Sequence, residues 1–411
     1  MENIFEGKTL LVCGNGMSGE SLETLKSWGL SVCLISEFAE DINVDLVDSY
    51  VKASTLDSDI ALEAAIGLAE EGWKFDAVIS LCWDCPISVA KIARHFDLPG
   101  LDVEKARNAT LKDVRTQLLQ QGGVLVPRFQ VVDVNENVND KIDSLSFPMV
   151  SKPVDLAGCK GVRFIRSRSE LDSYVRETFA FTTFSSEKRI LIEEYVDGTE
   201  YSVEGLVIDG KFFPTALSER VFTDDYLPEF CEIGDILPTV LSESTIKSIH
   251  STCQKSAEAL DIESGVLKFD IKISGELIYV FEVTPRLGGP RFGTEIVPLN
   301  NGTELLKAMV MQSLGVPVDT SLLTAKKSSG VVAFTVFAKA SGIIKAIKGL
   351  DNISSIAGFY DYKWWNLKGY GSGDKVKKGE RLFYYIVEGR DRKEAMDRAK
   401  QLESLVEIQY V

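Results

Sequence analysis

Acidic residues and an arginine stand close together in a short stretch about two thirds of the way along the chain. Glu282 lies near the end of the apolar run GELIYVFEV, and Thr284-Pro285-Arg286-Leu287-Gly288-Gly289 follows that run. A buried ionised carboxylate is costly unless something cationic compensates it. A metal ion is one such cation. The stretch therefore raises the question of which cation compensates Glu282, and other parts of the sequence bear on the answer.

Two lysines flank a glycine-containing loop earlier in the chain. FPMVSKPVDLAGCKGVRFIRS is typical of strand, loop and strand, with Lys152 on the first strand and Lys160 in the loop. The length and glycines of the loop, residues 155–161, predict a β-hairpin with a mobile tip. A loop that a ligand can approach closely, with ammonium groups on both sides, suits a triphosphate. A solvated hairpin is the alternative, and the P-loop pattern GxxxxGK[ST] is absent.

Composition limits the class of protein. The 411 residues are enough for two to four domains. The net charge of −16 argues against nucleic acid or an anionic membrane as the main partner. No apolar stretch has the roughly 20 residues of a membrane helix, and the N-terminus lacks the pattern of a signal peptide, so we expect a cytoplasmic protein.

Histidine and cysteine offer little chemistry. His95 and His250 are the two histidines, and they lie in unrelated helical stretches, so mechanisms built on a histidine base are poorly supported. Seven cysteines, an odd number, fit free thiols better than a disulfide framework. Cys82 and Cys85 form a lone CxxC, for which a strand end that enters a turn is the main interpretation and a redox or zinc site the alternative.

The first hundred residues predict an open parallel sheet covered by helices. KTLLVCG, the helix ESLETLKSWG and the strand SVCLIS form a βαβ unit, and further units follow to about residue 105. Gly14, Gly16 and Gly19 form GxGxxG at its turn, and Glu37 follows about 20 positions later. An NAD(P)-dependent oxidoreductase is therefore one alternative, although nothing downstream offers the usual hydride-transfer acid or base.

The remaining chain predicts a change of architecture. Residues 106–124 are expected to form one helix closed by a Gly pair. Several antiparallel strands then follow, joined by Asp-Gly and Ser-Gly turns. From about residue 316 the pattern indicates a small strand-rich domain with a helix.

The order of these pieces resembles the ATP-grasp superfamily, specifically its carboxylate-amine ligases of the L-amino-acid ligase type. The resemblance covers roughly residues 1–315, and its most specific stretches are FPMVSKPVDLAGCKGVRFI, ILIEEYVDGTEYSVEGLV and FDIKISGELIYVFEVTPRLGG. It implies an α/β (α+β) fold of four units. These are a Rossmann-like domain (1–105), a small ATP-grasp subdomain with the glycine loop (106–185), a large subdomain with the metal site (186–315) and a C-terminal α+β domain (316–411).

Under this resemblance Asp270 and Glu282 are the carboxylates, on adjacent antiparallel strands, that bind Mg²⁺, for which Mn²⁺ is a substitute. Oxygen ligands suit this ion. Two carboxylates this close would repel each other without a cation between them. Relatives commonly carry Asn where this chain has Thr284, so a metal bond from Thr284 would be weaker.

The resemblance also assigns residues to ATP and to the substrates. Lys112 and Lys152 grip phosphates, Lys268 joins the same cleft and Glu200 meets the ribose. The adenine hinge comprises Glu193, Glu194, Tyr195 and Val196. On the reacting side, Arg286 binds the acyl phosphate or the substrate carboxylate, Lys160 belongs to a lid, and Arg220 faces the substrate. Gly288 and Gly289 are expected to direct backbone N–H groups at the same oxygens.

The implied activity is ATP- and magnesium-dependent ligation of a carboxylate and an amine, with amino acids as the expected substrates. The carboxylate attacks the γ-phosphoryl group, and an amine then displaces phosphate from the acyl phosphate. Trp83, Glu219, Arg220 and Arg291 are candidates for the specificity pocket, and a homodimer is a further expectation. A non-catalytic ATP-binding protein is the second alternative, motivated by Thr284.

Overall fold

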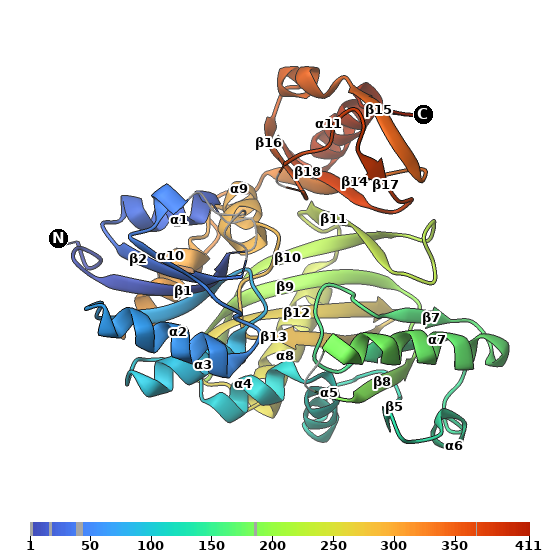
Figure 1. Ribbon diagram of the computed structural model, residues 1–411, viewed down its shortest axis with the longest axis horizontal. Helices are drawn as coiled ribbons and strands as arrows, with labels where there is room; N and C mark the ends of the chain where they lie inside the picture. The colour runs from blue at the N-terminus through green and yellow to red at the C-terminus, as the bar shows by residue number, and fades with distance from the viewer. Residues whose placement is uncertain (1–2, 16–18, 38–43, 185–186, 367) are drawn as a thin grey trace.

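The computed structural model describes residues 3–15, 19–37, 44–184, 187–366 and 368–411 (Figure 1). At the N-terminus a parallel sheet has the strand order β3-β2-β1-β4. The elements of this unit are β1 (Thr9–Asn15), α1 (Gly19–Ser27), β2 (Ser31–Ser36), a 3-10 turn (Val44–Leu46), β3 (Ser49–Lys52), α2 (Ser58–Glu70), β4 (Ala77–Leu81) and α3 (Pro86–His95). The expected parallel sheet is confirmed.

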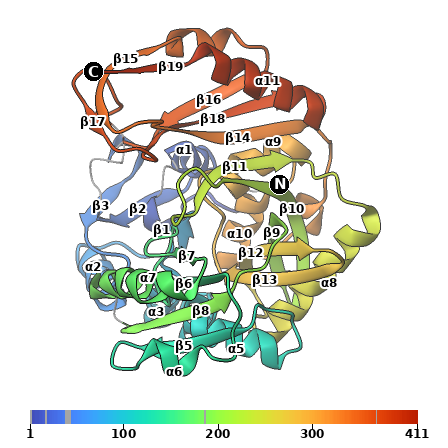
Figure 2. The same cartoon turned by 90° about the vertical axis from the view of Figure 1, so that its right-hand side faces the viewer.

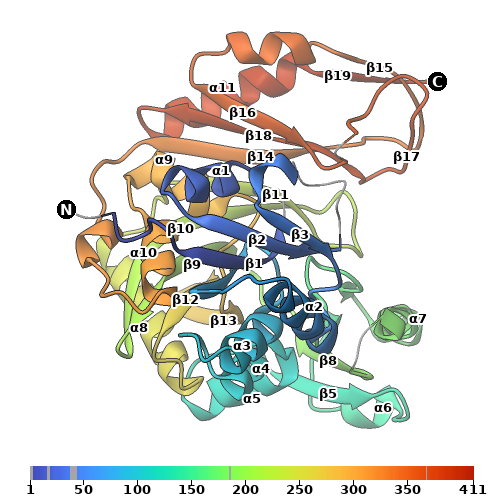
Figure 3. The same cartoon turned by 60° about the vertical axis from the view of Figure 1, so that its left-hand side comes forward.

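Both faces of this sheet are covered, which explains why β1, β2 and β4 read as continuous apolar runs. Leu11 and Cys13 of β1 pack in one cluster with α2 and α3. Leu10 and Val12 pack in another with α1 and with α10 (Leu305–Ser313), which comes from a later part of the chain (Figure 3). The N-terminal unit is thereby held against the centre of the molecule.

A second, smaller sheet has the order β5-β8-β6-β7, and α7 (Arg168–Phe181) packs on it. Its strands are β5 (Phe129–Asp133), β6 (Met149–Pro153), β7 (Arg163–Ile165) and β8 (Arg189–Glu194), with α6 (Val138–Lys141) and a 3-10 turn (Thr182–Phe184) between them. The antiparallel β6–β7 hairpin is confirmed. The expected boundary at residue 185 is wrong, because β8 pairs with β5 and β6 and so belongs to this small sheet.

The expected single helix over 106–124 is also wrong. The structure has α4 (Val103–Thr110) and α5 (Lys112–Gln121), separated by Leu111 in an extended conformation with ψ 116°. The first N–H groups of a helix have no partner within the helix. Here the N–H of Lys112 donates to the Val154 carbonyl oxygen at 2.8 Å. The break therefore places Lys112 beside the end of β6.

The large sheet has the order β13-β12-β9-β10-β11-β14-β18-β16 (Figure 2). Its strands are β9 (Thr199–Ile208), β10 (Lys211–Thr223), β11 (Cys231–Leu237), β12 (Gly265–Ser274), β13 (Leu277–Thr284), β14 (Gly330–Phe337), β16 (Phe359–Trp364) and β18 (Arg381–Gly389). Asp209-Gly210 joins β9 to β10, and Gly275 lies in the turn from β12 to β13, as expected. Pairing of β11 with β14 carries the sheet past the expected boundary at residue 316.

Helices and a short C-terminal sheet complete the fold. They are α8 (Glu243–Ala259), a π-helical turn (Phe292–Ile296), α9 (Val297–Asn301), a 3-10 turn (Thr320–Leu323), β15 (Gly342–Lys348), a 3-10 turn (Leu350–Ser355), β17 (Lys375–Val376), α11 (Arg392–Leu405) and β19 (Glu407–Tyr410). The small C-terminal sheet has the order β17-β15-β19. Of the described helices, none combines the length and apolar character needed to span a bilayer.

Alternation along β9 and β12 divides the large sheet into an apolar face and a polar face. Val203 and Phe269 point into a core cluster that includes Ile249 and Cys253 of α8. Full burial of one such apolar side chain stabilises the fold by about 1.5–3 kcal/mol. Because neighbouring residues on a strand point to opposite faces, Ser202, which follows Tyr201 and precedes Val203, points to the other side. That polar face carries the candidate site.

Candidate active site

The polar face of the large sheet carries alternating acids and lysines. On β12, every second residue of the stretch from 268 to 272 is charged, and the same stretch pairs with β9. The register forms three rows, with Lys268 opposite Glu204, Asp270 opposite Ser202, and Lys272 opposite Glu200. This arrangement follows from strict period-two alternation on two paired strands.

Asp270 and Glu282 are direct neighbours across the β12–β13 ladder. The expectation that adjacent antiparallel strands carry these two acids is confirmed. Burial raises the pKa of the Glu282 carboxyl, but the nearby cations Arg115, Lys112, Lys268 and Lys152 outweigh this effect and hold its pKa well below the usual range. Glu282 is therefore an ionised carboxylate at neutral pH, and about 30% of its side chain remains exposed.

Asp270 is surrounded by hydrogen-bond donors. Ser202 Oγ donates to Asp270 Oδ1 at 2.9 Å, and Arg220 Nη1 lies 3.1 Å from the same oxygen. Lys268 Nζ contacts this oxygen as well. Lys268 therefore compensates the charge of Asp270, and its role toward ATP stays a prediction.

These donor atoms fit a hard divalent cation. Carboxylate and hydroxyl oxygens, with one carboxylate held ionised, are the ligand chemistry of Mg²⁺. Among the described residues, no group of three or more His, Cys, Asp or Glu side chains is arranged to hold a metal. A cation at Asp270 and Glu282 would therefore take its remaining ligands from water and phosphate oxygens, which is typical of Mg²⁺.

Thr284 is buried next to this pair and lies opposite Lys268 in the register. Its Oγ1 is 3.5 Å from the Lys268 carbonyl oxygen. The hydroxyl is thus on the same ladder as Glu282, two residues further along the strand. A short hydroxyl reaches less far than a carboxylate or an amide side chain, so Thr284 is a weaker candidate than the two acids.

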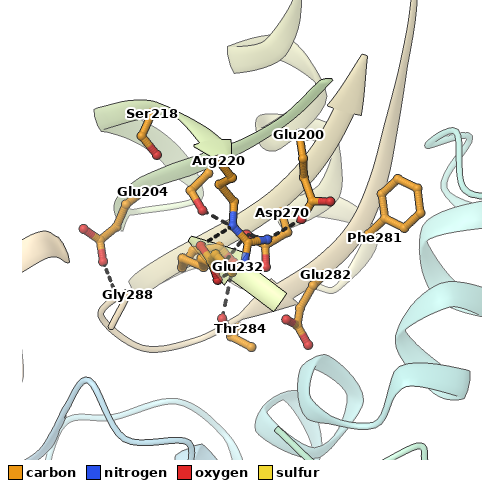
Figure 4. A network of polar contacts seen from close by, with 12 residues as sticks. Glu200, Glu204, Ser218, Arg220, Glu232, Asp270, Phe281, Glu282, Thr284 and Gly288 are labelled. Carbon is orange, nitrogen blue, oxygen red and sulfur yellow. Dashed lines mark hydrogen bonds and ion pairs between the residues drawn. The ribbon is translucent and has the colours of Figure 1, made fainter. Parts of the chain in front are cut away.

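Arg220 lies at the centre of an acidic cluster (Figure 4). Its Nε and Nη2 donate to the two carboxylate oxygens of Glu232 at 2.9 and 2.6 Å, and Nη1 contacts Glu200. Burial lowers the pKa of Arg220, but Asp270, Glu232 and Glu200 raise it well above its ordinary value. Arg220 therefore joins the proposed metal site to Glu200, the expected ribose residue. Glu232 was missed in the sequence, where no motif marks it.

Several cations lie between the small sheet and Glu282. Lys112 begins α5, and its Nζ donates to the Leu156 carbonyl oxygen in the glycine loop. Lys152 Nζ lies 2.6 Å from Glu193 Oε1, and both side chains are buried. Arg115, which the sequence analysis missed, is 3.7 Å from Glu282. It lies three residues after Lys112 on one helix face, and that spacing is a signal that could have found it.

The tip of the glycine loop is exposed, including Lys160. The hairpin that carries it contacts the β10–β11 connection, because the Phe164 N–H donates to the Pro228 carbonyl oxygen at 3.0 Å. Arg163 also lies 3.4 Å from Glu229. The hairpin therefore reaches across to the edge of the polar face, as a lid would.

The expected adenine hinge leaves the small sheet at the end of β8. Glu193 turns inward to Lys152, whereas Glu194 turns outward, where Arg128 Nε donates to it at 2.9 Å. The Tyr195 N–H donates to the Pro148 carbonyl oxygen at 2.9 Å. Within the described residues, the N–H of Val196 has no such backbone partner. Val196 is thus the hinge residue whose N–H can meet a base edge.

Arg286 lies where the large subdomain meets the N-terminal sheet. Its Nε is 3.3 Å from Asp84 Oδ1, and Nη1 donates to the Leu287 carbonyl oxygen at 2.8 Å. The expectation that the Gly288 N–H faces substrate oxygens is wrong, because this N–H donates to Glu204 (Figure 4).

Two of the candidates for specificity lie elsewhere. Glu219 neighbours Arg220 on β10 and so points to the opposite face, where Arg392 of α11 donates to it at 2.8 Å. Arg291 is fully buried and lies 3.0 Å from Asp361 of β16, with Glu295 also in contact. Both arginine contacts fix the C-terminal part of the chain.

The glycine motif of the N-terminal unit has a packing role at its first position. Gly14 has φ +69°, and a Cβ there would lie 2.2 Å from the Trp83 ring. The indole of Trp83 therefore accounts for a glycine at position 14 by packing alone. Gly16 of the motif lies outside the described residues. Cys82 and Cys85 form no disulfide with each other, and burial raises the pKa of Cys85 to about 12.

Comparisons with known proteins agree with this geometry. Residues 145–294 match the model of the ATP-grasp domain. The chain is 24% identical to carnosine synthase 1 of Gallus gallus over 77% of its length, and 23% identical to alanine–anticapsin ligase of Bacillus amyloliquefaciens over 49%. It spans 36% and 46% of the lengths of these two relatives.

A solved structure covers the whole fold. The crystal structure of L-amino acid ligase from Bacillus licheniformis superposes with a TM-score of 0.85 at 22% identity, covering 99% of each chain. The expected fold class is thereby confirmed. The range 145–294, which includes Lys152, Asp270 and Glu282, is thus similar to an ATP-grasp domain, and the solved structure shows the same fold along the whole chain.

Proposed function

We propose that this protein is an ATP- and Mg²⁺-dependent ligase that joins a carboxylate to an amine through an acyl phosphate. The observation that carries the proposal is the Asp270–Glu282 pair on the polar face, with Lys112, Lys152 and Arg115 grouped around Glu282. An ionised carboxylate among several buried cations suits a site that receives both a metal and a triphosphate.

Residues from the small sheet and from the large sheet would surround the nucleotide. Lys112 and Lys152 are placed to bind phosphate oxygens, and Lys152 keeps its position through Glu193. The Val196 N–H is available to the adenine edge. Glu200, fixed by Arg220 and by Lys272 at 3.6 Å, is the candidate for a ribose hydroxyl.

Asp270 and Glu282 would hold Mg²⁺, with Thr284 beside them, and the ion when bound would neutralise charge on the phosphate oxygens. Arg220 and Lys268 contribute positive charge at the same edge. Arg286 would orient the substrate carboxylate or the acyl phosphate with its planar fork. The β6–β7 hairpin with Lys160 would exclude water from the acyl phosphate, which otherwise hydrolyses.

We infer that both substrates are amino acids. This inference is supported by the names of the similar proteins, which are an L-amino acid ligase, an alanine–anticapsin ligase and a carnosine synthase. The planar guanidinium of Arg286 suits the carboxylate of such a substrate. The cytoplasmic location and the homodimer expected from the sequence stay predictions, and light scattering after size exclusion tests the second.

A matrix of amino-acid pairs, assayed for ADP release with ATP and Mg²⁺, tests this function. We expect release that requires both members of a pair, together with a dipeptide detected by mass spectrometry. The Glu282→Gln variant is the negative control, and Glu219→Gln, on the opposite face of β10, is the matched positive control. Bound ATP without any turnover over the whole matrix would contradict the ligase and support a nucleotide-binding protein.

A further inference from the structure

Glu204 is a fully buried acid that no step above uses. It lies on β9 in the same row as Lys268, two positions from Ser202, so it shares the polar face with the proposed metal site. Its Oε1 accepts a hydrogen bond from the Gly288 N–H (Figure 4). Its Oε2 is buried and has no hydrogen-bond partner among the described residues.

In the part of the chain that the structure describes, no cation forms an ion pair with Glu204. Lys268 is opposite in the register, but its ammonium group contacts Asp270. Burial raises the pKa of Glu204 to about 8, against the lowering effects of the Gly288 N–H, Lys268 and Arg286, while Asp235 of β11 raises it further. The neutral carboxylic acid therefore predominates at neutral pH. A neutral acid also adds no negative charge beside a site that must receive phosphate.

The segment around the carboxyl is shaped to admit it. Gly293 lies in the π-helical turn, and a Cβ there would be 2.3 Å from Glu204 Oε2. A Cβ on Gly288 would be 3.4 Å from Oε1 and 3.0 Å from the Phe292 ring. The carboxyl thus occupies the space between residues 288 and 293, and it contacts both ends of the segment that follows Arg286.

We propose that Glu204, as a neutral carboxylic acid, is a positioning residue that fixes the segment 286–289 on the sheet and thereby places Arg286 for the substrate. The proposal rests on the proposed function, in which Arg286 binds the acyl phosphate or the carboxylate. Glu204 acts through the Gly288 backbone and touches no reacting atom. The segment 286–289 requires the protonated, uncharged form of the Glu204 carboxyl.

Two variants and a control test this role. In Glu204→Gln an amide replaces the acid with the same shape, and its oxygen can still accept from Gly288. We expect near-normal ligation at pH 7 for this variant, and a loss in kcat on the order of ten- to a hundredfold for Glu204→Ala, which leaves the Gly288 N–H without a partner. ATP affinity should change little in both. Glu219→Gln controls for the loss of a carboxylate from the same sheet.

The pH profile separates positioning from a merely structural role. With a pKa of about 8, the neutral form of Glu204 is present below pH 8 and is lost above it. Activity of the wild type relative to Glu204→Gln should therefore fall about 30-fold between pH 7 and pH 9.5. Effects of pH on the amine substrate cancel in this ratio. A ratio that stays constant, or a Glu204→Gln variant that is inactive at pH 7, would overturn the proposal.

A spectroscopic readout keeps the test independent of ligation. In infrared difference spectra between pH 7 and pH 9.5, the wild type should lose a carbonyl band of a protonated carboxyl that Glu204→Gln lacks and Glu219→Gln retains. Absence of this difference means that Glu204 loses no proton between pH 7 and pH 9.5, which contradicts the proposed pH dependence. If the band is present while no amino-acid pair releases ADP, the proposed function fails and the protonated state of Glu204 stands.

Discussion

The buried Lys152–Glu193 pair permits a prediction whose size can be worked out. Lys152→Met keeps the volume of the side chain and removes its charge, which leaves Glu193 buried without a partner. At the observed 2.6 Å and an effective dielectric constant of about 20, the lost attraction is about 6 kcal/mol. Part of this lost attraction is offset, because the Lys152 ammonium group no longer has to be desolvated. The net cost of breaking one side of a buried pair is about 3–5 kcal/mol.

This loss should be local, because β6 and β8 lie in the small sheet, so a global unfolding midpoint is a poor measure of it. Hydrogen exchange followed by mass spectrometry on peptides of β6 and β8 is the better assay. We expect exchange of these peptides in Lys152→Met to accelerate about 10²- to 10⁴-fold. The double variant Lys152→Met/Glu193→Gln should recover most of the protection, since no uncompensated charge remains.

The neighbouring pair Arg128–Glu194 is a matched control on the same strand. Arg128 has 62% of its side chain exposed, so Arg128→Met should leave the exchange of the same peptides close to that of the wild type. Lys152 stabilises the small sheet through Glu193 and is also proposed to bind ATP. Addition of ATP separates these two roles, because the double variant should be folded yet lack stabilisation by ATP with Mg²⁺. Unchanged exchange of β6 and β8 in Lys152→Met would refute the reasoning, and so would full ATP stabilisation of the double variant.

Further predictions concern the acids, the glycine segment and the choice of nucleotide. Glu282→Gln should lower Mg²⁺-dependent ADP release at least a hundredfold, while its circular dichroism stays unchanged; near-normal turnover would contradict the site. Thr284→Asn should lower the Mg²⁺ concentration for half-maximal activity by about tenfold, and an unchanged Mg²⁺ titration would exclude a metal bond from this position. Gly293→Ala should lower the melting temperature through its clash with Glu204, and adding Glu204→Ala should restore part of it; additive effects would show that the two do not touch. ATP with Mg²⁺ should raise the melting temperature and NAD(P) should not, and the reverse order would revive the dinucleotide alternative.

Features encoded by local pattern could be predicted from the sequence. Alternation and the Ser-Gly turn place Asp270 and Glu282 on paired strands, and the register sets them opposite each other. The glycine loop between β6 and β7 is equally local. The role expected for Arg286 from the stretch TPRLGG stays a prediction, and its contact with Asp84 was not expected from the sequence.

Features that depend on long-range contacts could not be predicted. RILIEEYV is a strand, as expected, but its partners β5 and β6 precede it, and sequence order alone assigns it to the wrong sheet. Leu111 breaks the predicted helix because the Lys112 N–H bonds Val154 in another element. Glu204 and Glu232 look like ordinary strand acids in the sequence, and only burial and their neighbours distinguish them.

The unbroken ladder from β13 to β16 has a practical consequence for truncated versions of the chain. β11 is paired on one side with β10 and on the other with β14, which lies beyond residue 315. Removal of residues 316–411 would remove β14 and leave the backbone donors and acceptors of β11 beside Asp235 unpaired. Such open edges recruit other strands, so a shortened ATP-grasp fragment should self-associate, whereas the full chain keeps this edge closed.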